Sequence, residues 1–133
     1  MNLHTVGVKV VKEMRERTAW IDNLSYQKYC ELQNLGKTQY AEKMINDCNV
    51  LKNKLSNMLK YKNNIELYAL SSQQALVVIF KYYYLLTEEE KLYCKQCDKK
   101  ISKIMREKQK EANKINKERM YRKYKKKGKR RIS

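Results

Sequence analysis

The near absence of helix-breaking residues is the feature that most narrows the folds open to this chain. It contains no proline and only three glycines, Gly7, Gly36 and Gly128, among 133 residues. Proline and glycine are the residues least favourable inside helices, and an all-β chain needs many of them in its turns. The sequence therefore predicts an all-α protein, a small helical bundle with a long C-terminal helix that extends into a basic tail.

Apolar residues between positions 41 and 65 recur in alternating steps of three and four, a series that only Lys62 breaks. They are Ala41, Met44, Cys48, Leu51, Leu55, Met58 and Ile65, with Ile45 and Leu59 beside them. This heptad pattern puts one apolar face on a helix, and that face must be buried against another helix. The width of the stripe favours packing within one bundle. The alternative is a coiled-coil homodimer through residues 41–65.

Residues 2–24 allow two interpretations. Three valines alternate at positions 6, 8 and 10, as in a short strand. Val10, Met14, Ile21 and Leu24 instead fit one face of a helix, which we favour because no partner strand is evident. Trp20 is the only tryptophan, and we expect it in the core.

Glycine and polar residues mark the ends of the helices that follow. Residues 25–35 form a helical segment, and Gly36 directly after it suits the left-handed conformation just past a helix end. Thr38 is expected to cap the next helix, and Asn63 with Asn64 to end it.

Two segments have the pattern of a capping box. In this motif a Ser or Thr hydroxyl accepts a hydrogen bond from the backbone N–H three residues later, and the Glu or Gln side chain at that later position accepts one from the N–H of the Ser or Thr. Ser71 with Gln74 would begin an apolar central helix over residues 75–86, and Thr87 with Glu90 would begin a long helix at about Glu88. Successive residues of a helix turn by about 100°, so the tyrosines at 82, 83 and 84 cannot all face inward.

The cysteines are expected to be core residues. Cys94 and Cys97 form a CxxC motif and lie on an inner stripe with Ile101 and Ile104. A structural zinc site needs four ligands, and the other candidates stand alone in the sequence. We therefore predict no metal and no cofactor. The sequence contains no recognisable catalytic motif, and its single histidine, His4, has no acid at a spacing typical of a catalytic pair. We therefore expect a protein that is not an enzyme.

The most apolar window covers about 12 residues, whereas a membrane span needs about 20. The first residues do not resemble a secretory signal. We therefore expect no membrane partner and a cytoplasmic location, where the four cysteines stay reduced. Lys, Asn, Tyr and Ile have AT-rich codons, and their frequent use fits a phage or mobile-element accessory protein of a low-GC bacterium.

The charge of the chain is concentrated at one end. Residues 99–133 carry 17 Lys and Arg side chains against three Glu, a net charge of +14 out of +17 for the whole chain. Such asymmetry points to a polyanionic partner. We divide the chain accordingly into a helical bundle, residues 1–105, and a basic helical arm with a flexible tail, residues 106–133, the tail beginning at Lys125.

The predicted function is non-enzymatic binding of nucleic acid, DNA or RNA, through phosphate contacts with little sequence specificity. Two tyrosines among the cations would stack on unpaired bases. The candidate nucleic-acid-binding residues are Lys114, Lys117, Arg119, Tyr121, Arg122, Lys123, Tyr124, Lys125, Lys126, Lys127, Lys129, Arg130 and Arg131.

Other readings of the chain compete with this one. The heptad helix and the tyrosine cluster would also serve a protein-protein interaction module, such as a phage-encoded inhibitor or accessory factor of a larger host protein or ribonucleoprotein complex. The arm alone would also serve as a solubilising tail or, in a eukaryotic host, as a nuclear localisation signal. Binding to anionic lipid is disfavoured because the arm lacks a large apolar face.

Overall fold

The computed structural model is all-α, which confirms the predicted fold class. Its elements are α1 (Leu3–Asp22), α2 (Tyr26–Asn34), α3 (Gln39–Lys60), α4 (Ile65–Lys81), the short 3₁₀ helix η1 (Tyr83–Leu85) and α5 (Glu88–Ile132). The structure describes the backbone of residues 1–132 and the side chains of residues 1–122, and no strand occurs along that backbone.

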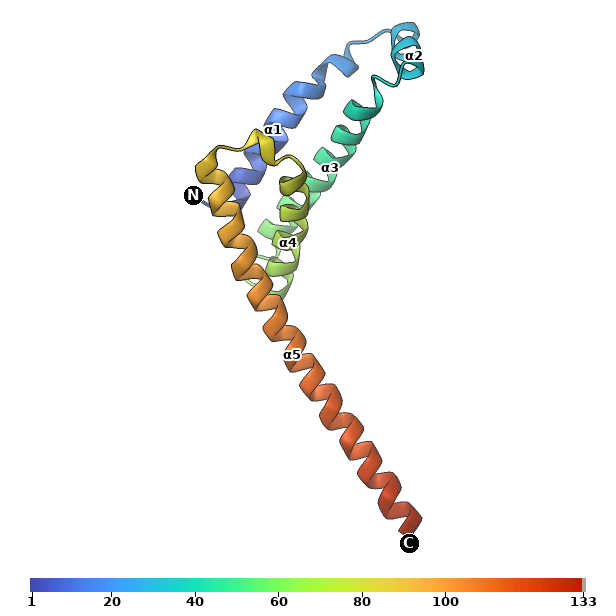
Figure 1. Ribbon diagram of the computed structural model, residues 1–133, viewed down its shortest axis with the longest axis vertical. Helices are drawn as coiled ribbons and strands as arrows, with labels where there is room; N and C mark the ends of the chain where they lie inside the picture. Colours follow the sequence, from blue (N-terminus) through green and yellow to red (C-terminus); the bar gives the residue numbers. More distant parts are fainter. Residues whose placement is uncertain (133) are drawn as a thin grey trace.

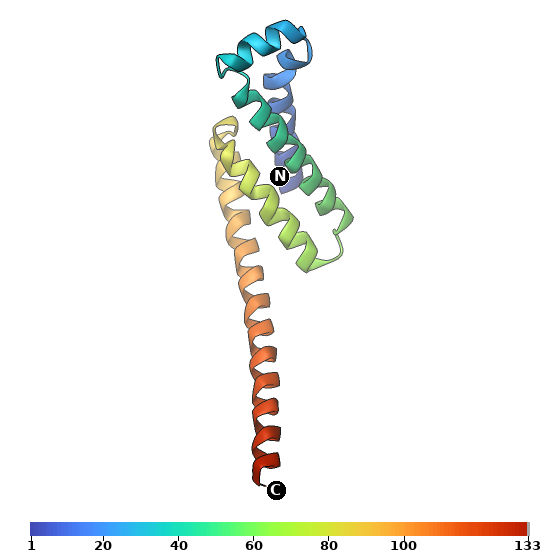
Figure 2. The same cartoon turned by 90° about the vertical axis from the view of Figure 1, so that its right-hand side faces the viewer.

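Four of the helices form an up-and-down bundle. Figure 1 and Figure 2 show α1, α3, α4 and the first part of α5 running in alternate directions, with α2 at the end where α1 passes into α3. Each helix packs on the next, α1 on α3, α3 on α4 and α4 on α5, and α1 also contacts α4 and α5. The second half of α5 leaves the bundle and projects beyond it.

The heptad face of α3 is covered by the chain's own helices. Its buried residues include Ala41, Cys48, Leu51, Leu55 and Met58, which belong to the face that the heptad defined. Because α3 packs on α1 and α4, the arrangement is the intramolecular one that the sequence favoured. A homodimer through residues 41–65 would need this same covered face.

Two apolar residues assigned to the stripe of α3 lie outside the core. Leu59 is 61% exposed, and Ile65 is 69% exposed. The reason is that α3 ends at Lys60, so Ile65 begins α4 instead of continuing the stripe. The prediction was therefore wrong for these two positions.

The helical interpretation of the N-terminal segment is confirmed. Val6 and Val10 are buried on α1, whereas Val8 is 48% exposed. The prediction for Trp20 was wrong, because this side chain is 41% exposed. The last buried residue of α1 is Thr18, so Trp20 lies beyond the end of the core, towards α2.

Two of the predicted helix boundaries are confirmed in detail. Gly36 has φ 72°, the left-handed conformation that glycine adopts without strain. At the start of α5, the Glu90 amide donates to Thr87 Oγ1 (3.2 Å) and the Thr87 amide donates to a Glu90 carboxylate oxygen (3.0 Å). Thr38 stands at the predicted N-terminus of α3, but its hydroxyl makes no cap hydrogen bond there.

The predicted capping box at Ser71 was wrong. Helix α4 begins six residues earlier, at Ile65, where the Leu67 amide donates to Asn64 Oδ1 (3.2 Å). Ser71 and Ser72 are therefore buried within the helix. Asn64 acts as the cap because the segment after it already has helix-forming residues, so the helix needs no second start.

The three tyrosines lie around the end of α4. Tyr82 is buried and donates a hydrogen bond to Asp47 Oδ2 of α3 (2.7 Å), and Tyr83 is half-buried. Tyr84 is 62% exposed, which confirms that at least one ring faces outward. The predicted central helix stops at Lys81 instead of Leu86, since the backbone turns through η1 before α5 begins.

Candidate nucleic-acid interface

Helix α5 is fixed to the bundle through its first five turns. Lys9 of α1 donates a hydrogen bond to Glu90 Oε1 at 2.6 Å, close to the helix start. Further on, the inner stripe places Cys94 and Ile101 in the core, and Ile104 and Met105 pack against it. The first part of α5 is therefore held in a set direction by both charge and apolar packing.

From Arg106 to Arg122 every residue of α5 is exposed. Among the side chains that the structure describes, one ion pair joins this stretch to the bundle, between Lys108 Nζ and Glu66 Oε1 (2.7 Å). Both groups are open to solvent, and such a pair contributes about 0–1 kcal/mol. Residues 106–122 accordingly have no packed face, and Figure 2 shows that this part of α5 projects away from the other helices.

Cations line the face of α5 opposite the bundle. They recur in steps of three and four, which keeps them on one side of a helix, and all are exposed. We call this row the outer stripe; it consists of Lys95, Lys99, Lys103, Arg106, Lys110, Lys114 and Lys117. Tyr121, which is 69% exposed, continues the row by one more step.

The two flanks of the outer stripe differ in charge. All three acids of the arm, Glu107, Glu111 and Glu118, fall along one flank. Over residues 106–122 the other flank is uncharged and contains Gln109 and Asn113, whose side chains are hydrogen-bonded at 3.2 Å. Within residues 106–122, four of the seven cations and none of the acids therefore lie on the outer face.

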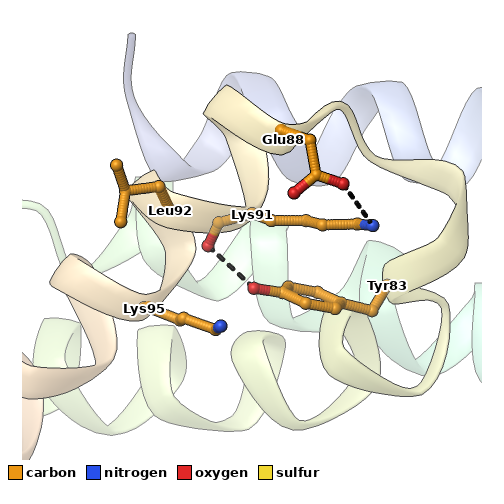
Figure 3. A pocket seen from close by; sticks show the side chains of 5 residues that line it. All are labelled: Tyr83, Glu88, Lys91, Leu92 and Lys95. Carbon is orange, nitrogen blue, oxygen red and sulfur yellow. Dashed lines mark hydrogen bonds and ion pairs between the residues drawn. The ribbon is translucent and has the colours of Figure 1, made fainter.

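The outer stripe begins on the bundle, beside Tyr83. Figure 3 shows the Tyr83 ring between the side chains of Lys91 and Lys95. The two ammonium groups lie 5.4 and 5.7 Å from the ring centroid, and the Tyr83 hydroxyl donates to the Lys91 carbonyl oxygen (3.0 Å). Lys91 is also paired with Glu88 at 3.1 Å. Among the side chains that the structure describes, Lys95 has no carboxylate within ion-pair distance.

The predicted site residues divide into three groups. Lys114, Lys117 and Tyr121 lie on or in line with the outer stripe, whereas Arg119 and Arg122 point to the side of the helix that faces the bundle nearer its start. Lys117, Tyr121 and Arg122 come together with Glu118 around a shallow hollow. The side chains of the others lie outside the described residues: Lys123, Tyr124, Lys125, Lys126, Lys127, Lys129, Arg130 and Arg131.

The backbone of α5 continues as helix to Ile132, past Gly128. The sequence had predicted a flexible end from Lys125, and the side chains of that segment lie outside the described part. The sequence interpretation also missed the first five cations of the outer stripe. Their spacing could have revealed them, because the three- and four-residue steps used to find apolar faces apply equally to charges.

The CxxC motif lies at the edge of the core, with Cys94 buried and Cys97 partly buried. Within residues 1–122, no three His, Cys, Asp or Glu side chains are placed to hold a metal ion together. Cys94 is fully buried, and this burial raises the pKa of its thiol to about 11, which disfavours the thiolate that metals and disulfide exchange require. All four cysteines are free.

Comparisons of the chain with models of protein families, with curated proteins and with solved structures found no match. In the described part of the chain, no helix has both the length and the apolarity to cross a membrane.

Proposed function

We propose that the protein binds nucleic acid without catalysing a reaction, through phosphate contacts made by its basic arm and with little sequence specificity. The observation that carries this proposal is the net charge of +14 on residues 99–133, combined with the full exposure of residues 106–122. Residues 106–122 have no packed face and therefore contribute little to the fold of the bundle.

Physical chemistry favours a polyanion as the partner. Like charges on neighbouring turns repel each other, and a row of phosphates relieves that repulsion. Lysine and arginine release condensed counterions when they bind phosphates, so the affinity should fall steeply with salt. Few groups on the arm suit base edges: Asn113, Asn116 and the arginines. The partner is therefore DNA or RNA recognised through its backbone, free or within a larger ribonucleoprotein complex.

The test is fluorescence anisotropy of labelled DNA and RNA oligonucleotides with the full-length protein, from about 50 to about 300 mM salt. The arm variant replaces Lys114, Lys117, Arg119 and Arg122 by Gln. Four lost phosphate contacts should reduce the slope of log affinity against log salt by about 3 on a single strand and nearly 4 on a duplex.

The matched control removes four exposed cations of α3 and the loop after it, by replacing Lys43, Lys52, Lys60 and Lys62 with Gln. It has the same net charge as the arm variant. If both variants lose affinity equally, the arm is not the binding site. If the unaltered protein binds no oligonucleotide even at the lowest salt, the proposal fails altogether.

A second candidate function, protein binding, is favoured by one observation at the other end of the molecule. Helix α2 buries no residue, and large apolar side chains around it are open to solvent: Trp20, Tyr26, Leu35 and Tyr40. Exposed aromatic residues of this kind are common in protein interfaces. A pull-down with nuclease treatment tests it: a partner that survives nuclease and is lost on Tyr26→Ser with Tyr40→Ser supports this function, and loss of every partner on nuclease contradicts it.

A further inference from the structure

We infer that the outer stripe, from Lys95 to Lys117, is a track for a single strand of nucleic acid, and that this track begins on the bundle instead of in the tail. The inference rests on the proposed function and makes it more specific. It names which face of α5 binds, where that face starts and which form of nucleic acid it takes.

The first argument is the straight course of the stripe. Seven cations follow one side of a helix, and with a rise of about 1.5 Å per residue they cover about 33 Å. Neighbouring cations are about 4.5 to 6 Å apart along the axis by the same rise. A flexible single strand can adjust its phosphates to such a line, whereas the phosphates of one duplex strand are fixed about 3.4 Å apart along the duplex axis.

The second argument excludes insertion into a duplex groove. A helix in the major groove has a phosphate backbone on each side, because that groove is about 12 Å wide and a helix nearly fills it. On α5 one flank carries Glu107, Glu111 and Glu118, which would face one of those backbones. The other flank offers uncharged Gln109 and Asn113 to the second backbone. The charge distribution suits contact on one side only.

The third argument concerns the outside of a duplex. Each duplex backbone winds around the axis, so a straight row of cations on a rod meets a given strand only where the two paths cross. A single strand can follow the whole row. Contacts with all seven cations would give a salt slope of about −5 for a single strand.

Aromatic rings stand at both ends of the track. Tyr121 follows Lys117 by one helical step and is 69% exposed, so its face is open to stack on an unpaired base. At the other end, the Tyr83 ring lies between Lys91 and Lys95, so Lys95 is in contact with a fixed part of the bundle (Figure 3). A duplex has no unpaired base to offer to Tyr121.

The experiment compares two triple variants of the full-length protein with equal net charge. The stripe variant is Lys103→Gln, Lys110→Gln and Lys114→Gln, all on the outer stripe. The control variant is Lys91→Gln, Lys100→Gln and Lys108→Gln, all on other faces of α5. The probes are an oligothymidylate of about 20 nucleotides, longer than the track, and a duplex of the same length. Circular dichroism and the Tm confirm that both variants fold.

The stripe variant should lose about two units of salt slope and roughly tenfold or more in affinity for the single strand. The control variant should stay within about threefold of the unaltered protein, and the unaltered protein should prefer the single strand to the duplex. Equal losses in both variants, or tighter binding to the duplex, overturn the track while leaving the proposed function intact. No binding to either probe by the unaltered protein overturns both.

Discussion

Gly7 lies where α1 passes over α3. A Cβ atom at this position would lie 3.0 Å from Leu55 Cδ1 and 3.2 Å from Leu55 Cγ, and Leu55 is 4% exposed in the core. Alanine favours a helix over glycine by about 1 kcal/mol, but overpacking costs about 1–3 kcal/mol. We expect Gly7→Ala to lower the free energy of unfolding by up to about 2 kcal/mol in urea titrations.

The sign of this effect should depend on Leu55. In a Leu55→Ala background the added methyl group has room, so Gly7→Ala should raise the free energy of unfolding by about 1 kcal/mol. A double-mutant cycle measures the difference. If Gly7→Ala has the same effect in both backgrounds, the close approach of these two helices does not explain the glycine.

Glu90 should make stability depend on pH. Its pKa is lowered, first by the hydrogen bond from Lys9 and then by the Thr87 amide, and the same hydrogen bond raises the pKa of Lys9. The Glu90 contribution is therefore present above the ordinary carboxyl value of 4.5 and is lost as pH falls through the lowered pKa. The Lys9 contribution is present below 10.5 and is lost as pH rises through the raised pKa.

Glu90→Gln tests this dependence in melting experiments across pH. The Tm of the variant should lie below that of the unaltered protein between those two values, and the difference should vanish in strong acid. Glu31→Gln is the control, because it breaks a pair of 3.8 Å in which both side chains are exposed, and such pairs contribute little. A Tm difference that persists unchanged in strong acid would rule out the charge of Glu90 as its cause.

At the scale of elements, α2 should be the least stable helix among those of residues 1–105. It has nine residues and buries none, and isolated helices of this length are marginal in water. Its supports are the Ser25 cap, which accepts from the Lys28 amide at 3.2 Å, and a hydrogen bond from the Tyr29 hydroxyl to Glu42. We expect its amides to exchange with solvent nearly as fast as those of an unstructured chain.

Hydrogen exchange read out by mass spectrometry measures this directly, with α3 as the internal reference. The amides of α3 around Leu51 and Leu55 should exchange only through global unfolding, since these residues are buried in the core. Protection of α2 equal to that of α3 would show that α2 docks on the bundle more firmly than its exposure indicates.

Helix boundaries set by local chemistry were predictable from the sequence. Gly36 and the pair Thr87 and Glu90 act on their own neighbouring backbone, so the pattern alone is enough. Ser71 has the same kind of pattern, yet Asn64 had already begun the helix. A capping motif indicates that a helix can begin at a residue. Whether it does begin there depends also on the residues before it, which can already be helical.

Burial was less predictable, because it depends on where each helix leaves its neighbours. Trp20 is apolar and lies on α1, but the end of α1 extends beyond the core, and Trp20 lies in that part of the helix. The candidate site was predicted from the local density of cations, which is highest towards the C-terminus, and it therefore covered residues from Lys114 to Arg131. The outer stripe depends instead on helical phase, and the residues from Lys95 to Lys110 were missed for that reason.

At the scale of the whole molecule, the bundle should fold without the arm. Residues 106–122 are all exposed, and the ion pair between Lys108 and Glu66 is open to solvent. A chain that ends at residue 109 keeps this pair and the apolar contacts of Ile104 and Met105. Its Tm should agree with that of the full chain within about 2 °C, which corresponds to less than about 0.5 kcal/mol at this size.

Differential scanning calorimetry of the two proteins provides the comparison, together with the salt titration described above. The shortened chain retains Lys95, Lys99, Lys103 and Arg106 of the outer stripe. We expect weak residual binding with a salt slope of about −3 to a single strand, from four contacts. A large drop in Tm would show that the arm packs on the bundle in solution.

The continuity of α5 has a mechanical consequence. The helix crosses from the core into solvent without a break, so no joint separates the part that packs from the part that is charged. From Glu88 to Tyr121 its rise of about 1.5 Å per residue gives a stiff lever of about 50 Å. On the track that we propose, a bound strand would be held at a set distance and orientation with respect to the α2 end, as it would be on a spacer of defined length.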